Sequence, residues 1–252
     1  MLKIRIMPTL LYKEFGLVKG TAFNSWRRVG AAMQAIKVYN MREVDELVFL
    51  DITATQESRQ PDFDLIDDLA DECFMPLTVG GGVREPEDVR RLLMVGADKV
   101  AINSSAIERQ NIVGECARRF GSQCIVVSID ARRGPSGQFQ TYTHSGTQPT
   151  GLNPVEVAKR AAADGAGEIM ITSIDRDGTM EGYDLELTRQ VSTAVDIPVI
   201  ASGGAGSPGD MVAALEQGGA SAIAAASIFH FTEQTPAMAK DVLRENGFSV
   251  RN

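Results

Sequence analysis

Eight short apolar runs recur along the 252-residue chain, and stretches with helical apolar spacing separate them. Because the runs are continuously apolar rather than alternating, they are typical of parallel strands covered on both faces. Eight such β–α units in a chain of this length predict a single (β/α)8 barrel over residues 1–252. The alternative is a doubly wound open sheet, but YKEFG follows the first run where that fold usually carries G-x-G-x-x-G. The predicted strands are 4–11, 46–52, 77–80, 99–102, 124–130, 168–175, 198–203 and 222–229.

An internal repeat supports the barrel. PLTVGGG from Pro76 matches PVIASGG from Pro198, which lies 122 residues later, and DELVFLDI matches GEIMITSI at the same offset. The repeat predicts two fused half-barrels of about 1–122 and 123–252. Two fused halves predict two similar sites that face each other across the barrel mouth.

Glycine and serine residues at the predicted strand ends indicate anion binding. Gly80–Gly82 follow the third strand and Gly203–Gly204 the seventh, while Asn103–Ser104 and Ala226–Ser227 begin the helices after the fourth and eighth. Glycine lets the backbone approach a ligand, and hydroxyls and backbone N–H groups bind phosphate oxygens. The pattern predicts a substrate with two phosphate ends. Tight turns without a ligand are the alternative explanation.

Carboxylates also close several predicted strands. Asp51, Asp130, Asp175 and Asp177 lie at carboxyl ends, where (β/α)8 barrels form their active sites. Asp130 ends the very apolar run CIVVSID, so desolvation is expected to raise its pKa toward that of a general acid or base. The alternative is that these side chains cap helices or bind backbone amides.

Four charged residues open strands at the opposite rim: Arg5, Glu46, Lys99 and Glu168. In a barrel they would form a ring of alternating charge, which is costly unless the charges are paired. The ring predicts either a salt-bridge plug or a gate to an internal passage.

Composition excludes several function classes. Lys and Arg number 25 against 33 Asp and Glu, and this net charge of −8 disfavours non-specific nucleic-acid binding. No apolar run approaches the roughly 20 residues that span a bilayer, so we expect no membrane association. The three cysteines lack metal-ligand spacing. We expect a cytoplasmic protein with no metal and no redox cofactor.

The chain resembles HisF, the cyclase subunit of imidazole glycerol phosphate synthase, over essentially its whole length. ELVFLDITA, PLTVGGGVR, GADKVAIN, GSQCIVVSIDA, TSIDRDGT, PVIASGGAG and ASIFHF carry the resemblance. It implies a HisH-like glutaminase partner that releases ammonia at the barrel bottom, and a passage through the barrel to the mouth. Arg5, Glu46, Lys99 and Glu168 match the family's gate. Asp98 and Gln123 match its partner-facing positions.

The same resemblance assigns substrate contacts and one catalytic residue. Asp130 matches one of the two catalytic aspartates of the family. Lys19, Asp51 and Asp177 join the expected substrate-binding residues at the mouth. One phosphate site matches Gly82, Asn103 and Ser104, and the other matches Gly178, Gly204, Ala226 and Ser227.

The second catalytic aspartate is absent. The family reads C-L-D-V-K at the end of strand 1, whereas this chain has Leu11 within Thr9–Lys13. Leucine cannot transfer a proton, and losing such a group typically costs about 10²–10⁴-fold in rate. Leu11, GLVK and EVDEL resemble the HisF-like (WbuZ-type) branch of acetamidino-sugar, or surface-polysaccharide, modification. That resemblance implies a sugar amidotransferase as a further partner.

Three alternatives remain open from the sequence. The chain could be the histidine-pathway cyclase, with Asp51 or Tyr12 replacing the lost acid. It could be a non-catalytic subunit that channels ammonia and activates its glutaminase. A sugar-phosphate isomerase of the same pathway is the most distant, since it also needs a carboxylate on strand 1.

Overall fold

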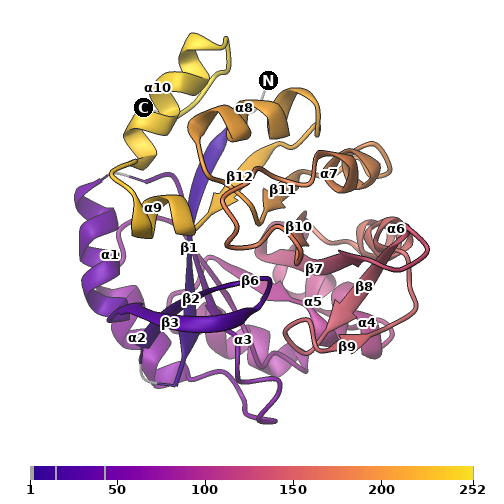
Figure 1. The fold of residues 1–252 in the computed structure, drawn as a ribbon. Helices are drawn as coiled ribbons and strands as arrows, with labels where there is room; N and C mark the ends of the chain where they lie inside the picture. The colour runs from indigo at the N-terminus through magenta and orange to yellow at the C-terminus, as the bar shows by residue number, and fades with distance from the viewer. Residues whose placement is uncertain (1–2, 15, 43, 252) are drawn as a thin grey trace.

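Eight parallel strands close into a barrel in the computed structural model, which describes residues 3–14, 16–42 and 44–251 (Figure 1). Pairing of β12 with β1 and of β7 with β10 completes the ring and confirms the predicted (β/α)8 barrel. Phe15 and Glu43, which belong to the segments KEFGLVKG and EVDEL, lie outside the described residues. The barrel strands are β1 (Arg5–Lys13), β4 (Leu47–Asp51), β5 (Leu77–Gly80), β6 (Lys99–Ile102), β7 (Ile125–Arg133), β10 (Glu168–Ser173), β11 (Val199–Ser202) and β12 (Ala222–Ala225).

Helices surround the barrel and pack an apolar face against it (Figure 1). Side-chain caps start several of them: Asp62 before α2, Asn153 before α6 and Thr235 before α10 each accept a backbone N–H. The longer helices are α1 (Ala32–Met41), α2 (Phe63–Asp71), α3 (Pro86–Met94), α5 (Ile112–Phe120), α6 (Pro154–Asp164), α7 (Leu185–Ser192), α8 (Pro208–Glu216) and α10 (Pro236–Glu245). The short ones are α4 (Ser104–Glu108), α9 (Ser227–Phe231) and the 3₁₀ turn Ser122–Cys124. No helix within the described ranges is long and apolar enough to cross a membrane.

The predicted strand 222–229 is wrong beyond its first half. The strand ends at Ala225, and Ser227 begins α9, so the apolar residues Ile228 and Phe229 are buried on a helix. An apolar run without polar interruptions does not by itself distinguish a buried strand from a buried helix. Each of the other seven runs coincides with a barrel strand, although β1 and β7 extend beyond the predicted ends to Lys13 and Arg133.

Two antiparallel hairpins extend from equivalent strands of the two halves. β2 (Gly16–Thr21) and β3 (Asn24–Gly30) follow β1, while β8 (Phe139–Thr143) and β9 (Gln148–Pro149) follow β7. The connection within the second hairpin is short, because β7 continues to Arg133 and β8 starts at Phe139. The repeated hairpins support the two-fold repeat, and in Figure 1 the β2–β3 hairpin lies in front of the barrel.

Alternate residues of each barrel strand point inward, and they form successive layers along the barrel axis. On β1 this series runs from Arg5 through Met7 and Thr9 to Leu11. Next to the charged end lies an apolar cluster inside the barrel, which contains Met7, Val48, Ala101, Val126, Met170, Ile200, Ala222 and Ala224. The barrel interior therefore passes from charge at the bottom, through hydrocarbon, to a mixed polar and apolar mouth.

The C-terminal segment packs against the barrel beside the start of β1. Lys240 on α10 forms a buried ion pair of 2.7 Å with Asp45, and Asp45 also accepts a hydrogen bond from the Ile6 backbone N–H. Val250 bridges to Ile4. Removing one partner of such a buried pair is strongly destabilising, so this contact holds α10 to the barrel.

Candidate functional site at the barrel mouth

A cavity of about 120 Å³ lies at the carboxyl ends of the strands, below the β2–β3 hairpin. Lys19, Phe23 and Trp26 of the hairpin line it from above. Of the substrate and catalytic residues predicted from sequence, the structure brings ten around this cavity, and Gly82 is not among them. The ten are Lys19, Asp51, Asn103, Ser104, Asp130, Asp177, Gly178, Gly204, Ala226 and Ser227.

Asp130 is a buried carboxyl on β7, at the barrel mouth. Its Oδ2 accepts a hydrogen bond of 2.9 Å from the Asn103 side-chain amide. Burial raises the pKa of Asp130 to about 7, since desolvation outweighs the opposing hydrogen bonds from Asn103 and Thr172. A carboxyl with this pKa can both donate and accept a proton near neutral pH, which is what general acid–base catalysis requires.

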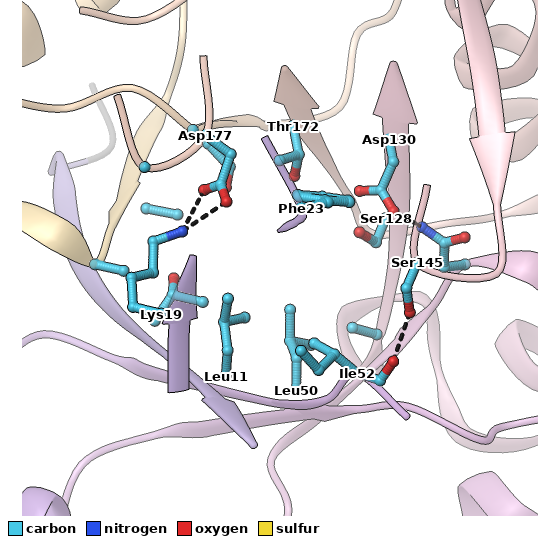
Figure 2. A pocket seen from close by; sticks show the side chains of 18 of the residues that line it. Leu11, Lys19, Phe23, Leu50, Ile52, Ser128, Asp130, Ser145, Thr172 and Asp177 are labelled. Atoms are coloured by element: carbon cyan, nitrogen blue, oxygen red, sulfur yellow. Dashed lines mark hydrogen bonds and ion pairs between the residues drawn. The ribbon is translucent and has the colours of Figure 1, made fainter. Parts of the chain in front are cut away.

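Leu11 occupies the position on β1 that Asp130 occupies on β7. Leu11 pairs with Leu50 on the neighbouring barrel strand and with Val18 on its hairpin. Asp130 pairs in the same way with Thr172 and Tyr142. Figure 2 shows the result: Leu11, Leu50 and Ile52 form one wall of the cavity, and Asp177, Thr172 and Asp130 face them. The cavity therefore has one apolar and one polar wall.

Lys19 and Asp177 form a buried ion pair across the mouth. Lys19 Nζ lies 2.6 Å from both carboxylate oxygens of Asp177, and the lysine is 2% exposed. The Ala22 backbone N–H donates to the Asp177 carbonyl oxygen at 2.7 Å. Gly178 follows with φ of +77°, and a side chain there would overlap the Gly20 carbonyl oxygen. These contacts hold the β2–β3 hairpin down over the cavity.

Asp51 is engaged in its own loop. Its Oδ1 accepts hydrogen bonds from the Thr53 N–H, the Thr53 hydroxyl and the Ala54 N–H, each at 3.0 Å. Its Oδ2 pairs with Arg59 at 3.2 Å. This carboxylate organises the β4–α2 loop. Tyr12, the other residue considered as a replacement acid, stacks on Phe49 and is not among the residues lining the cavity.

The two expected phosphate sites lie on opposite sides of the mouth. Ser104 and Asn103 begin α4 on one side, and Ser227 and Ala226 begin α9 on the other. Gly82 lies behind the first site, where its N–H points to the Thr55 hydroxyl at 3.4 Å. Gly178 and Gly204 border the second site, and both have positive φ. The repeat therefore builds two related but unequal recesses.

The charged residues of the bottom rim form a closed ring. Arg5 contacts Glu46 at 2.7 Å and Glu168 at 2.9 Å, and Lys99 contacts the same two carboxylates at 3.0 and 3.2 Å. Thr78 Oγ1 donates to Glu46 at 2.7 Å. Burial acts to lower the pKa of Arg5, but Glu168 and Glu46 outweigh it and the pKa is raised. All four charges are paired, so the ring seals the barrel in this conformation.

Asp98 and Gln123 are exposed beside this ring. Asp98 precedes Lys99 and accepts a hydrogen bond from the Leu77 N–H at 2.8 Å, and Gln123 lies in the turn before β7. Both are therefore available to a molecule that covers the bottom of the barrel.

Several cavity residues were missed by the sequence analysis, including Thr9, Phe23, Ser128, Ser145 and Thr172. Strand parity could have found three of them, because Thr9 is two residues before Leu11, Ser128 two before Asp130, and Thr172 four after Glu168. Phe23 and Ser145 lie at hairpin tips, and no strand pattern places a hairpin tip. In the part of the chain that the structure describes, no three His, Cys, Asp or Glu side chains are grouped to hold a metal ion.

A closed (β/α)8 barrel with a buried acid and two glycine- and serine-bordered recesses at its mouth is typical of the class of barrel enzymes whose active sites lie at the carboxyl ends of the strands. The family comparison agrees with this class. Residues 5–235 match the family described as histidine biosynthesis protein, and the chain belongs to that family. Its members are enzymes, namely isomerases and cyclases.

Proposed function

We propose that this chain is the synthase subunit of a glutamine amidotransferase complex. It receives ammonia from a docked glutaminase at the barrel bottom and delivers it to a phosphate-bearing substrate at the mouth. The observation that carries the proposal is the ring of Arg5, Glu46, Lys99 and Glu168 on the same barrel axis as Asp130.

The interior between the ring and the mouth favours a small neutral molecule. Its middle layer is hydrocarbon, with Met7, Val48 and Met170 among the side chains. Ammonium and other ions would lose their hydration there at a large cost, whereas neutral ammonia loses much less. Opening one ion pair of the ring would give ammonia access to this layer. Methionine is flexible and can move aside without leaving a fixed void.

We further propose that the product belongs to the acetamidino-sugar branch of surface-polysaccharide synthesis. Leu11 supports this, because the wall formed by Leu11, Leu50 and Ile52 offers no second acid for an imidazole ring closure. In amidine formation the ammonia nitrogen bonds to the carbonyl carbon of an N-acetyl group, the C–O bond breaks, and the oxygen leaves with the phosphoryl or nucleotidyl group that the sugar amidotransferase has attached to it. One acid–base residue, Asp130, suffices at the ammonia-delivery end.

The experiment compares glutamine-driven with ammonium-driven nitrogen transfer in the reconstituted complex, using ¹⁵N-labelled donors. Lys99→Ala should lower the glutamine-driven rate relative to the ammonium-driven rate, because ammonia then escapes at the opened ring. Lys159→Ala is the matched control, since Lys159 is exposed on α6. An unchanged ratio for Lys99→Ala, or no complex with any glutaminase encoded beside this chain, would contradict the proposal.

The histidine-pathway cyclase is the second candidate, favoured by Asp177. This carboxylate lines the same cavity as Asp130 and is held by Lys19, so the pair could supply the missing acid. The assay for this candidate is turnover of the imidazole precursor. A normal rate from the wild-type complex would select the cyclase, whereas a low rate that Leu11→Asp raises supports the acetamidino branch.

A further inference from the structure

The backbone ladder between β1 and β4 stops short of the bottom rim. Among the described residues it begins at Thr9 and Val48, and neither is the first residue of its strand. The other barrel ladders include the first residue of at least one of their two strands, as Arg5 of β1 does in its pairing with Ala222. Side chains must therefore hold β1 to β4 at the rim, and we call this boundary the β1–β4 seam.

Pro8 explains why the ladder ends where it does. The Ile6 N–H donates to Asp45 Oδ2 and the Tyr12 carbonyl oxygen accepts from the Ile52 N–H, so both residues of β1 direct backbone groups toward β4. In a parallel sheet, every second residue of a strand faces the same neighbour. Pro8 lies at this spacing between Ile6 and Tyr12, and proline has no N–H to donate. The seam therefore lacks a backbone donor just above the rim.

Asp45 closes the β1–β4 seam from outside the barrel. Its Oδ2 accepts the Ile6 N–H at 3.0 Å, and its Oδ1 lies 2.7 Å from Lys240 Nζ. Asp45 and Lys240 are each 5% exposed. Ile6 follows Arg5 in the chain, and Asp45 precedes Glu46. The contact between Ile6 and Asp45 is thus the neighbour, in the barrel wall, of the Arg5–Glu46 ion pair of the ring.

The C-terminal segment contacts both sides of the seam. On the β1 side, the Ile4 N–H donates to the Ser249 carbonyl oxygen at 2.7 Å. On the β4 side, Lys240 binds the Asp45 side chain, and Arg251 Nη1 lies 3.4 Å from the Asp45 carbonyl oxygen. The helix α10 also packs on β1. Two strands that lack a ladder at the rim are therefore joined there by α10 and the residues after it.

We propose that Asp45 is a positioning residue for the charged ring. Anchored by Lys240, it holds β1 against β4 at the rim and keeps Arg5 in contact with Glu46. A buried carboxylate without its cation is costly, so loss of Lys240 turns Asp45 toward water and releases the Ile6 N–H. The seam then widens, and the ring opens between Arg5 and Glu46. The proposal rests on the proposed function only for the use of the ring as an ammonia passage.

Hydrogen exchange on the full chain tests the seam without any substrate. Lys240→Met should raise amide exchange at the starts of β1 and β4 by at least about tenfold, and the starts of β10 and β11, which have ladders at the rim, should change little. Lys240→Arg keeps a cation beside Asp45 and should restore most of the protection. The double variant Asp45→Asn/Lys240→Met removes both buried charges, so it keeps the test available if Lys240→Met does not fold.

The reconstituted complex tests the effect on the ring. Lys240→Met should lower the ratio of glutamine-driven to ammonium-driven nitrogen transfer about threefold or more, because ammonia escapes at the opened seam. Leu187→Ala is the matched control: it removes a buried side chain from α7, which packs on β10 and β11 and not on the seam. This control should lower stability and leave the ratio unchanged. Lys240→Arg should keep most of the wild-type ratio.

Three results would each overturn the inference. They are unchanged exchange at the starts of β1 and β4, a ratio that Lys99→Ala lowers and Lys240→Met does not, and an equal fall of the ratio in Leu187→Ala. Failure of the proposed function is recognised separately, because Lys99→Ala itself would then leave the ratio unchanged. In that case the exchange experiment alone decides whether Asp45 positions the ring.

Discussion

Asp130→Asn should stabilise the protein, and by an amount that grows with pH. The folded protein holds the Asp130 proton more tightly than the unfolded chain does, because burial raises the pKa from 3.8 to about 7. Stability is therefore lost as the pH rises between these two values. By pH 8 the charged carboxylate costs the folded state roughly 4 kcal/mol, and at pH 5 less than 2 kcal/mol. Asparagine has no such dependence.

The assay is urea denaturation of wild type and Asp130→Asn at pH 5 and pH 8. The stability difference between the two proteins should shift by about 2.5 kcal/mol in favour of the variant over this range. With Asp130 in place, Thr172→Val should enlarge the pH dependence of stability, because the Thr172 hydrogen bond lowers the pKa of Asp130. A stability difference that stays constant from pH 5 to pH 8 would refute the claim that burial raises the pKa of Asp130. Asp130→Asn should also lower the rate of nitrogen transfer by at least about 10²-fold.

Three further predictions concern packing. Lys240→Met leaves the buried carboxylate of Asp45 without its cation and should cost about 3 kcal/mol in urea denaturation, with α10 losing amide-exchange protection first. Gly178→Ala should raise the exposure of Trp26 to quenchers and weaken phosphate binding, whereas Gly137→Ala, with a similar φ of +80° but open space around it, should change only stability. Leu11→Asp should destabilise the protein by roughly 2 kcal/mol, more at pH 8 than at pH 5, because the new carboxyl would face Leu50.

The barrel could be predicted from the sequence because its strands are short, apolar and separated by helices of regular spacing. Residues an even number of positions apart on a strand lie on the same face, and this rule relates the two ends of the barrel. Arg5 and Leu11 share a face of β1, and Glu168 and Thr172 share a face of β10. The ring at the bottom follows from the same rule. Residues at equivalent strand ends must converge once the barrel is closed.

The sequence could not predict what the loops do to those residues. Asp51 and Asp130 both close apolar strands, yet Asp51 is held by three donors of its own loop and Asp130 by the side chain of Asn103. Ser104 and Ser227 are equivalent in the repeat, but the Ser104 hydroxyl accepts a hydrogen bond from the His144 N–H of a distant turn, whereas the Ser227 hydroxyl has no partner among the described residues. Such differences arise from tertiary contacts of hairpin tips, which local patterns do not encode.

Leu11 and Asp130 occupy equivalent positions in the two halves of the barrel, but one side chain is apolar and the other is ionisable. A duplicated structure first presents the same group twice, and each copy can then change without loss of the other. Here one copy carries an ionisable oxygen and its counterpart carries hydrocarbon. A molecule in the mouth consequently has one favoured orientation, in which its polar side contacts Asp130 and its apolar side contacts Leu11. The two-fold repeat of the scaffold thereby favours one orientation of the bound molecule over the reverse.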